Sequence, residues 1–554
     1  MSYGVYSGKE TLVNERGDAL TNFTILESKM FYDATDDRTR EVLRLKILHQ
    51  GKRHQVDLDL RNPNLLQQIQ QTIPTCKIFR RSDYSRIEAH ILELPINDQA
   101  QQSTRPLYFR QHGFHNLNDG TYVFVAGDEV LELPDSQEWL VAAEVARAHL
   151  AYDETLTLRQ AVEGFWAVLK KNKDQLLPIW GFTLLSSMRS LFSQLSLTTF
   201  PFCAVIGGQG LGKTTICQRF SLLYDDLQRP GRHWAEIDAK STAASTVDTI
   251  SRYRDQVVLL DDLAKSISTA QMRERKNLLG DVLRFASNET NRCKMDGSQQ
   301  LQEYFCNVGL IFTGEFSLDN PSDISRTITV PINEQLQGGK QQDRVLAATA
   351  FRWFILWMLS RIDEAVANLS EELERVQGDH QRLQKNRIMI LWALAQFLLF
   401  VQESGAVTEQ RIAKMRNHAV NICDSLIDEQ ISQIDRLNAS KNLSWYILDG
   451  TQQGIIHPVS IKKIRKNKPL PDYYYIPSKD GETLYMRTEV LYRYFTEKTP
   501  IHLTSSRDMD AQLTTEGIVH HRKEGRAAGI RIDGRRYLDM RRIDLIAAAS
   551  RTGG

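Results

Sequence analysis

Residues 202–215 read FCAVIGGQGLGKTT and carry the strongest structural signal in the chain. The apolar run at 202–206 predicts a buried strand, and residues 207–214 fit the pattern G-x-x-x-x-G-K-[ST]. An amphipathic helix is expected to follow. A glycine-rich loop between a strand and a helix lets backbone N–H groups converge on phosphate oxygens, and the helix N-terminus adds positive potential. The sequence therefore predicts a phosphate site made of Gly207, Gly208, Gln209, Gly210, Leu211, Gly212, Lys213, Thr214 and Thr215.

Two residues at the end of this loop have specific expected roles. Lys213 should bridge the β- and γ-phosphates of a nucleoside triphosphate, and the Thr214 hydroxyl should complete the coordination of magnesium. The loop thus predicts ATP and Mg²⁺ as cofactors. A glycine-rich loop without a ligand is the alternative.

A second apolar run that ends in acidic residues, QVVLLDD at 256–262, follows this loop. Asp261 should hold the magnesium ion through water, and Asp262 should polarise the attacking water as general base. Glutamate is commoner at the second position, so the shorter Asp262 leaves the hydrolysis rate open. An edge strand that ends in solvated acids is the alternative.

Two further residues follow the same logic. A third apolar run, 307–312, ends at Thr313, which we expect to contact the γ-phosphate and the attacking water, unless it is a plain strand-terminating threonine. Arg326 directly precedes the run TITVPI at 327–332. An arginine there can enter a neighbouring subunit's site and stabilise charge on the transferred phosphoryl group. The alternative is an ion pair within the subunit.

A basic hairpin is predicted between the acid pair and Thr313. Asp296-Gly297 is a typical hairpin turn, and basic residues precede it. In a ring, such a hairpin would point Arg292 and Lys294 into the central channel toward a nucleic-acid backbone. A surface hairpin with solvated charges remains the alternative.

Length and composition indicate several globular domains. The chain has 554 residues, of which 42% are hydrophobic and 25% charged. Its 69 Lys and Arg nearly balance 68 Asp and Glu, which argues against bulk coating of a polyanion. Six scattered cysteines favour neither a zinc module nor a disulfide framework. We read the apolar run Ile388–Val401 as a buried helix, because it is shorter than a membrane span. We expect a cytoplasmic protein without a membrane partner.

The order of patterns predicts a multidomain α/β protein. A hairpin turn is expected at Asp119-Gly120, within a β-rich first part. The expected domains are an N-terminal β-rich domain at 1–150, a helical segment leading into the core at 151–200, a P-loop core at 201–335, a helical region at 336–450 and a basic domain at 451–554.

The basic domain has the pattern of a winged helix. Residues 451–554 contain 19 Lys and Arg against 12 Asp and Glu, a net charge of +7. The cluster Lys462–Lys468 reads as a flexible strap, and two helices are expected at 488–495 and 505–513, the second capped by serine. A basic β-hairpin follows. In a winged helix the second helix enters the major groove and the wing holds phosphates, although winged helices that bind protein also exist. The expected DNA contacts are Arg522, Lys523, Arg526, Arg531, Arg535 and Arg536.

Taken together, the motifs GGQGLGKTT, VVLLDDL, FTGE and ISRTITVPI resemble the P-loop ATPases of phages and mobile elements. These include the minichromosome-maintenance-like, self-loading replicative helicases of chromosomal cassettes and pathogenicity islands. The double Asp is also similar to superfamily-three viral helicases. The resemblance covers residues 155–335 and extends more loosely to 112–131 and to the basic domain.

This resemblance implies an ATP-dependent DNA helicase or replication initiator. The family's ATPase is typically a hexameric AAA+ ring that moves along single-stranded or duplex origin DNA, with a winged helix at its C-terminus. It implies that Arg326 acts in trans and that Lys294 contacts DNA. Arg382 or Arg387 would be a second sensor.

Three other functions compete with this one. A regulatory NTPase would use nucleotide only to switch assembly, without unwinding DNA. A packaging motor would need an acidic nuclease cluster after the ATPase, and none is visible in 340–554. Asp57 and Asp59 alternate on one strand as in a primase metal site, but no Ser-x-His partner motif follows, so an exposed strand face is favoured.

Overall fold

The computed structural model divides the chain into two compact units. The first comprises Met1–Ser317 and Arg326–Asp424, and the second comprises Leu318–Ser325 and Ser425–Gly554. The structure describes residues 5–35, 38–98, 105–195, 200–238, 243–263, 306–315, 320–335, 341–440, 442–466, 468–499, 503–519, 529–532 and 535–550, the short stretches 279–280, 282–283, 285–286, 292–295 and 301–304, and residues 318 and 501.

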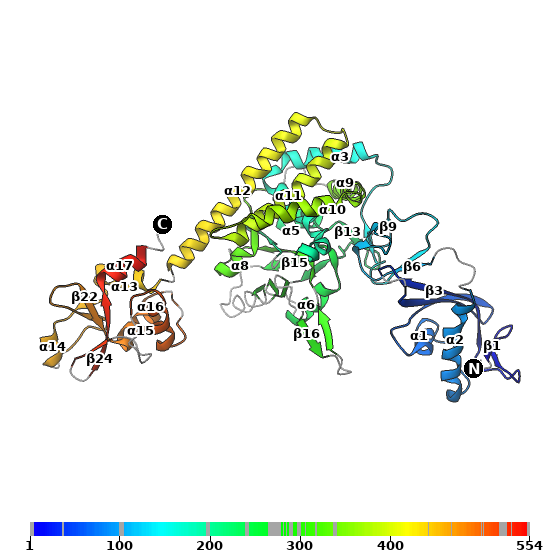
Figure 1. The fold of residues 1–554 in the computed structure, drawn as a ribbon, viewed down its shortest axis with the longest axis horizontal. Coiled ribbons are helices and arrows are strands. Elements are labelled where there is room, and N and C mark those ends of the chain that lie inside the picture. The colour runs from blue at the N-terminus through cyan, green and yellow to red at the C-terminus, as the bar shows by residue number, and fades with distance from the viewer. Residues whose placement is uncertain are drawn as a thin grey trace. The chain divides into compact units, whose positions relative to one another are not determined.

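The N-terminal part is a five-stranded sheet covered by two helices on one face (Figure 1). Apolar side chains of β4 and β5 pack against Leu66, Ile69, Ile87 and Ile91 of the helices. The strand order is β10-β6-β3-β4-β5, and β1 and β2 form a separate ladder. The sequence did not predict the two helices. The elements are β1 (Val5–Ser7), β2 (Leu12–Asn14), β3 (Phe23–Asp33), β4 (Arg40–His49), β5 (Lys52–Asp59), α1 (Leu65–Thr72), η1 (Arg81–Asp83), α2 (Tyr84–Asp98), β6 (Leu107–Phe109) and β10 (Trp139–Val141).

A three-stranded antiparallel sheet leads toward the core. Its strands are β7 (Gly113–Asn116), β8 (Tyr122–Val125) and β9 (Val130–Leu131). The β7–β8 turn contains Gly120 at φ +83°, which confirms the hairpin predicted from Asp119-Gly120. Next, β11 (Ala148–Leu150) pairs antiparallel with β13 (Tyr224–Asp226) of the core.

The core is a fully parallel five-stranded sheet in the order β14-β15-β18-β12-β19. Because parallel sheets are covered on both faces, their strands are continuous apolar runs, as in β12 and β18. The β16–β17 hairpin extends from the core, away from α9, α10 and α11 (Figure 1). The elements are α3 (Leu158–Lys171), α4 (Lys173–Ser186), η3 (Arg189–Leu195), β12 (Phe202–Gly207), α5 (Lys213–Phe220), β14 (Glu236–Asp238), α6 (Ala243–Ser251), β15 (Arg254–Leu263), β16 (Arg292–Met295), β17 (Leu301–Tyr304), β18 (Asn307–Gly314), α8 (Pro321–Ser325) and β19 (Thr327–Ile332).

Long helices follow the core sheet. These are α9 (Gln341–Leu359), α10 (Ile362–Glu374), α11 (Gln381–Glu403) and α12 (Glu409–Ser440). The predicted buried helix at 388–401 is part of α11, where Phe397 packs edge-on against the fully buried Trp180. Within the described residues, no single helix is long and apolar enough to cross a membrane. The α9–α10 pair reaches that length and hydropathy only together, with a bend of 89°.

The second unit combines helices with a sheet in the order β20-β21-β22-β24-β23. The two helices predicted at 488–495 and 505–513 are present, and the Ser505 hydroxyl accepts a hydrogen bond from the backbone N–H of Asp508. The strap expected at 462–468 is instead partly helical, because Ile464 is buried in the unit's core. The elements are α13 (Leu443–Gln452), β20 (His457–Pro458), α14 (Ile461–Arg465), β21 (Tyr474–Pro477), β22 (Thr483–Met486), α15 (Thr488–Lys498), α16 (Ser506–Thr515), β23 (Gly529–Ile532), β24 (Arg535–Arg541) and α17 (Arg542–Ser550).

A buried carboxylate joins the β7–β8 hairpin to the start of β15. Asp255 is fully buried at φ +48°, and its carboxylate accepts hydrogen bonds from the Phe114 N–H (2.9 Å) and the Ser190 N–H (2.7 Å). Arg254 donates to the Phe114 carbonyl at 2.6 Å, and His112 Nδ1 lies 3.1 Å from the Arg254 carbonyl. The hairpin therefore fixes the amino end of the strand whose other end carries Asp261.

Gly113→Ala should disrupt this junction. Gly113 has φ +96°, and an added Cβ would lie 2.2 Å from Asp255 Oδ2. We expect the free energy of unfolding to fall by about 3 kcal/mol in urea titrations. Gly120→Ala is the matched control, because it also has positive φ but nothing within 4 Å of the new Cβ, and it should cost about 1 kcal/mol. Equal losses would show that the contact with Asp255 is unimportant.

The same junction should make the first unit sensitive to acid. Burial, reinforced by the Arg254 charge, lowers the pKa of His112 and of His115 to about 3. Unfolded histidine titrates near 6.5, so the unfolded state takes up protons first as the pH falls. The contribution of these neutral histidines to the free energy of unfolding is therefore fully present above about pH 6.5. It should fall by about 2 kcal/mol per histidine by pH 5. Urea midpoints between pH 7.5 and pH 5 measure this, and His115→Gln should reduce the slope.

Candidate functional site

The residues predicted to bind nucleotide meet at the carboxyl edge of the core sheet. Strand β12 ends in the glycine-rich loop, β15 carries Asp261 and β18 carries Thr313. The strand order places β18 between β12 and β15. Thr313 therefore comes from the strand that separates the loop from the acidic residues, at the edge where parallel α/β sheets bind ligands.

The glycine-rich loop has the geometry of an anion site. Gly210 and Gly212 have φ of +77° and +83°, in the left-handed region that favours glycine. Gly212 directly precedes α5, whose N-terminus has no side-chain cap, so its first N–H groups are not satisfied by a side chain. The Lys213 ammonium donates to the carbonyls of Gly207 (2.9 Å) and Gly208 (2.8 Å) and thus lies over the loop.

One carboxylate oxygen brings three of the predicted residues together. Asp261 Oδ1 accepts hydrogen bonds from the Thr214 hydroxyl at 2.8 Å and from the Thr313 hydroxyl at 2.6 Å. These contacts join α5, β15 and β18 at the loop. Asp262 follows on β15, but its side chain lies outside the described residues.

A β-bulge next to Thr313 was not predicted. Leu260 pairs with Phe312 and Leu263 pairs with Gly314, so Asp261 and Asp262 together lie opposite Thr313 alone. A bulge of this kind turns side chains away from simple alternation, and bulges are common beside active sites. The strand distorts where the acidic residues occur.

The donor set fits a magnesium nucleotide. Among the described residues, no group of three or more His, Cys, Asp or Glu side chains could hold a metal by itself. Magnesium in phosphate sites usually takes few protein ligands and completes its shell with water and phosphate oxygens. Thr214 and Asp261, hydrogen-bonded beside the loop, supply such a pair.

Sequence reasoning missed one residue of the loop's surroundings. The Gln335 side chain donates to the Gly210 carbonyl at 3.0 Å. Gln335 follows β19 and is far from the loop in sequence. No local pattern marks it, because its position depends on the pairing of β19 with β12.

Arg326 lies at the opposite edge of the sheet. Its carbonyl accepts from the Phe202 N–H at 2.9 Å, at the amino end of β12. The loop begins at the other end of that strand, about 17 Å away at the usual rise per residue. Burial, and then the charge of Arg326, lower the pKa of Arg382 on α11, so these two cations are neighbours. Arg387, the other candidate sensor, forms an ion pair with Asp424.

The helix before Arg326 is held by α12. The Gln430 side chain, which is 2% exposed, donates to the Ile324 carbonyl at 3.2 Å, and Gln433 donates to the Leu318 carbonyl at 2.7 Å. These contacts lie within the second compact unit, whose first segment ends at Ser325. No local sequence pattern marks this contact.

The predicted DNA contacts are described only in part. Arg292 and Lys294 lie on β16, which pairs antiparallel with β17 as the predicted hairpin requires, but their side chains are outside the described residues. Arg531 and Arg535 are exposed on β23 and β24. Arg536 is described only in its backbone, and Arg522, Lys523 and Arg526 lie outside the described residues.

The two acids of the N-terminal strand do not form a shared site. Asp57 pairs with Arg44 at 2.7 Å, and Asp59 pairs with Arg61 at 2.8 Å. Each carboxylate thus has its own arginine, which agrees with an exposed strand face.

Comparison with known proteins places the fold among helicases. A solved structure described as "SCCmec type IV Cch - active helicase" matches with a TM-score of 0.57 and 14% identity, covering 99% of each chain. The fold is helicase-like. The predicted resemblance to mobile-element helicases is thus confirmed for the fold, which is a mixed α/β multidomain architecture with a parallel sheet and many helices. No protein-family model and no curated protein matches the sequence.

Two further solved structures match more weakly. A JCV helicase structure with a bound small molecule has a TM-score of 0.20 and 12% identity, over 48% of this chain and 74% of that one. The NrS-1 C-terminal region has a TM-score of 0.29 and 8% identity, over 93% and 96%.

Thr313→Val should separate nucleotide binding from turnover. It removes the hydroxyl that bonds Asp261 while keeping the side-chain shape. If the hydroxyl orients reacting groups, turnover should fall by about 100-fold with little change in nucleotide affinity. Thr313→Ser, which keeps a hydroxyl, should restore most of the turnover. Steady-state ATPase assays and titration with a fluorescent ATP analogue measure the two effects. Full turnover in the valine variant would leave Thr313 a structural residue.

Proposed function

We propose that this chain is an ATP-dependent DNA helicase or replication initiator of a phage or mobile element, acting in the cytoplasm. It would hydrolyse ATP at the subunit interfaces of a ring, which we expect to be hexameric. The observation that carries the proposal is the Asp261 carboxylate, bonded to Thr214 and Thr313 beside a loop with two left-handed glycines. This arrangement occurs in a helicase-like fold.

Each side chain of the site would have a separate role in ATP hydrolysis. Lys213 and the free N–H groups at the start of α5 would bind the β- and γ-phosphates, and Thr214 and Asp261 would hold Mg²⁺. The ion, when bound, neutralises charge that develops on the phosphates. Asp262 would take up the proton of the attacking water, and Thr313 would orient that water relative to the carboxylate.

Arg326 would complete the site of a neighbouring protomer. It lies at the sheet edge opposite its own loop, so it cannot reach its own nucleotide across the strands. The triphosphate of an adjoining subunit is the anion that Arg326 would stabilise in this arrangement.

DNA would be contacted at two places. The second unit contains a serine-capped helix, α16, and a hairpin, β23–β24, with Arg531 and Arg535 exposed, which fits a winged helix. The β16–β17 hairpin would contribute Arg292 and Lys294 inside the ring. The rival reading, a regulatory NTPase, predicts ATP turnover without strand separation, so a forked-duplex unwinding assay decides between them.

A mixing experiment tests whether the site is shared between protomers. Lys213→Ala should lose ATP binding, whereas Arg326→Ala should keep binding and lose DNA-stimulated turnover. In equal mixtures of the two variants, about a quarter of head-to-tail interfaces would join an intact loop to an intact Arg326 and should regain turnover. Mixtures as inactive as the separate variants, in particles shown by light scattering to have exchanged subunits, would show that Arg326 does not act in trans.

A further inference from the structure

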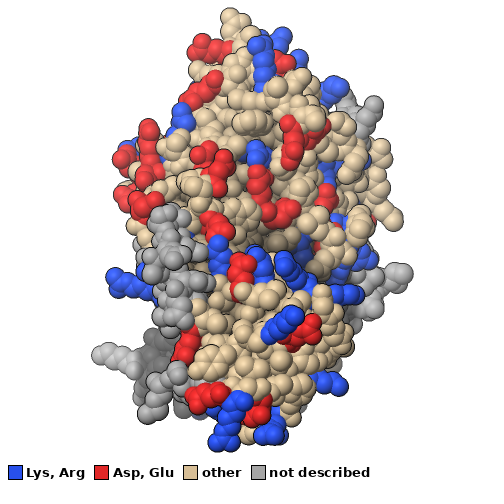
Figure 2. All heavy atoms as spheres, turned by 90° about the vertical axis from the view of Figure 1, so that its right-hand side faces the viewer, with Lys and Arg blue, Asp and Glu red and all other residues tan. Residues whose placement is uncertain are grey.

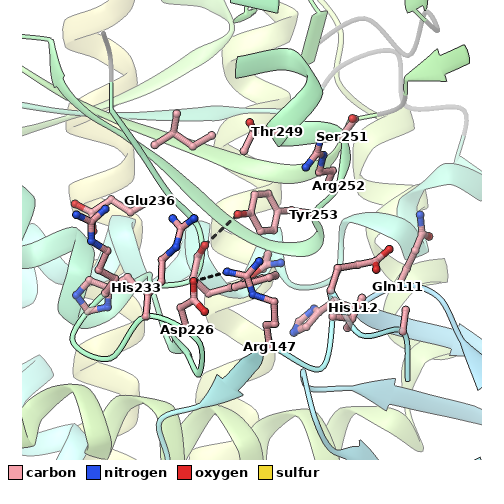
Figure 3. Close-up of a pocket in the computed structure, with 18 of the residues that line it drawn as sticks. Gln111, His112, Arg147, Asp226, His233, Glu236, Thr249, Ser251, Arg252 and Tyr253 are labelled. Carbon is pink, nitrogen blue, oxygen red and sulfur yellow. Dashed lines mark hydrogen bonds and ion pairs between the residues drawn. The ribbon is translucent and has the colours of Figure 1, made fainter. Parts of the chain in front are cut away.

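Basic side chains in the first compact unit often have acidic neighbours. Acidic and basic side chains lie interspersed on the face drawn in Figure 2. A pocket of the core shows the same pattern: Arg147 and Asp226 point toward each other and form an ion pair of 2.9 Å (Figure 3). The acids Glu144, Glu236 and Asp261 line the same pocket. Neither surface therefore favours a polyanion as its ligand.

A basic segment of the second compact unit lacks such neighbours. Residues 459–471, which include α14, contain five lysines and arginines and no Asp or Glu. None of the five side chains forms an ion pair or a hydrogen bond with any described residue, and all but Lys463 are exposed. We call these five residues the α14 patch: Lys462, Lys463, Arg465, Lys466 and Lys468. Their charge is available to a partner.

The fold holds the α14 patch in place. Val459, Ile464 and Leu470 pack into one apolar cluster of the second unit, and Ile464 is only 8% exposed. The Val459 N–H donates a hydrogen bond of 2.8 Å to the Tyr475 carbonyl, which attaches the segment to β21. The cations therefore project from an ordered helix, so a ligand need not first order the backbone that carries them.

The same cluster connects the α14 patch to the β23–β24 hairpin. Ile532 and Tyr537 of the hairpin belong to the cluster that buries Ile464. Ile532 is paired with Arg535, and directly opposite residues of antiparallel strands have their side chains on the same face. Arg535 therefore lies on the sheet face that α14 covers. Its side chain is exposed and has no ion pair with any described residue.

Two acidic residues near this face leave it positively charged. Glu489 is already paired with Arg487 at 3.2 Å. Asp539 lies opposite Tyr485, four residues beyond Arg535 along β24, which is about 13 Å at the usual rise per residue. The α14 patch and Arg535 therefore form one basic surface.

We propose that the α14 patch, together with Arg535, binds the phosphate backbone of duplex DNA. This rests on the DNA binding of the proposed function and adds a contact on α14, outside the hairpin and α16. Single strands are usually bound by stacking bases on aromatic rings, but Tyr474 and Tyr537 on this face are buried and Tyr485 is partly buried. The patch adjoins Arg535, an expected DNA contact, which favours DNA over an acidic protein. A contact with phosphates alone is independent of base sequence.

Salt titration of full-length variants tests the α14 patch. In Lys462→Ala/Lys466→Ala two phosphate contacts would be lost, so the slope of log K against log salt for a fluorescent duplex should become shallower by about 1.8. If the affinity at 1 M salt is unchanged, this corresponds to about 60-fold weaker binding at 0.1 M salt. Two duplexes of unrelated sequence should behave alike, and the slope for oligothymidylate should stay at the wild-type value. Both lysines are exposed and alanine favours helix, so the variant should fold as the wild type does.

The control is Lys9→Ala/Lys52→Ala, which removes two exposed lysines from the N-terminal part of the chain. It should keep the wild-type slope. A patch variant that also keeps the wild-type slope on duplex DNA would overturn the inference, as would a loss of affinity confined to oligothymidylate or to polyglutamate. These outcomes leave the proposed function standing. A wild-type chain that shows the expected slope but neither hydrolyses ATP nor separates a forked duplex would overturn the proposed function and leave the α14 contact standing.

Discussion

The Asp261 carboxylate is the contact on which the geometry of the candidate nucleotide site depends. Hydroxyl groups from α5 and from β18 donate to the same oxygen, so the loop, the acidic strand and the strand between them are fixed relative to one another. The bulge in β15 lies at this point and places two acidic residues opposite one residue of β18.

The other end of β15 is fixed just as firmly. Asp255 is fully buried, and its charge is stabilised by the neighbouring Arg254 guanidinium and by hydrogen bonds from Phe114 and Ser190. Burial raises the pKa of Asp255, and the Arg254 charge and the two N–H donors oppose that shift. The strand is therefore held by the N-terminal hairpin at one end and by two threonines at the other, so a shift of the hairpin would be felt along the whole strand.

What the sequence could predict was local. The glycine-rich loop, the acids at 261–262 and the helix cap at Ser505 each depend on neighbours within a few residues, and the structure contains the corresponding elements. The fold-level resemblance to helicases was also predicted correctly. The bulge at Asp261 and the contact of Gln335 depend on strand pairing, which local patterns do not reveal. Helix α1 was missed although Leu65, Leu66 and Ile69 lie on one face, because its eight residues are too few for a helical period to stand out from the surrounding β pattern. The roles of Asp262, Arg292 and Lys294 stay predictions, because their side chains lie outside the described residues.

The boundary between the compact units has a mechanical consequence for Arg326. Ser325 belongs to the unit that Gln430 and Gln433 hold together, whereas Arg326 begins the next segment of the other unit. The backbone of Arg326 is thus joined by one peptide bond to the second compact unit, a body that also contains the C-terminal sheet and helices. Under the proposed function, a pull by DNA on that body would be transmitted to the backbone of Arg326 through this one peptide bond.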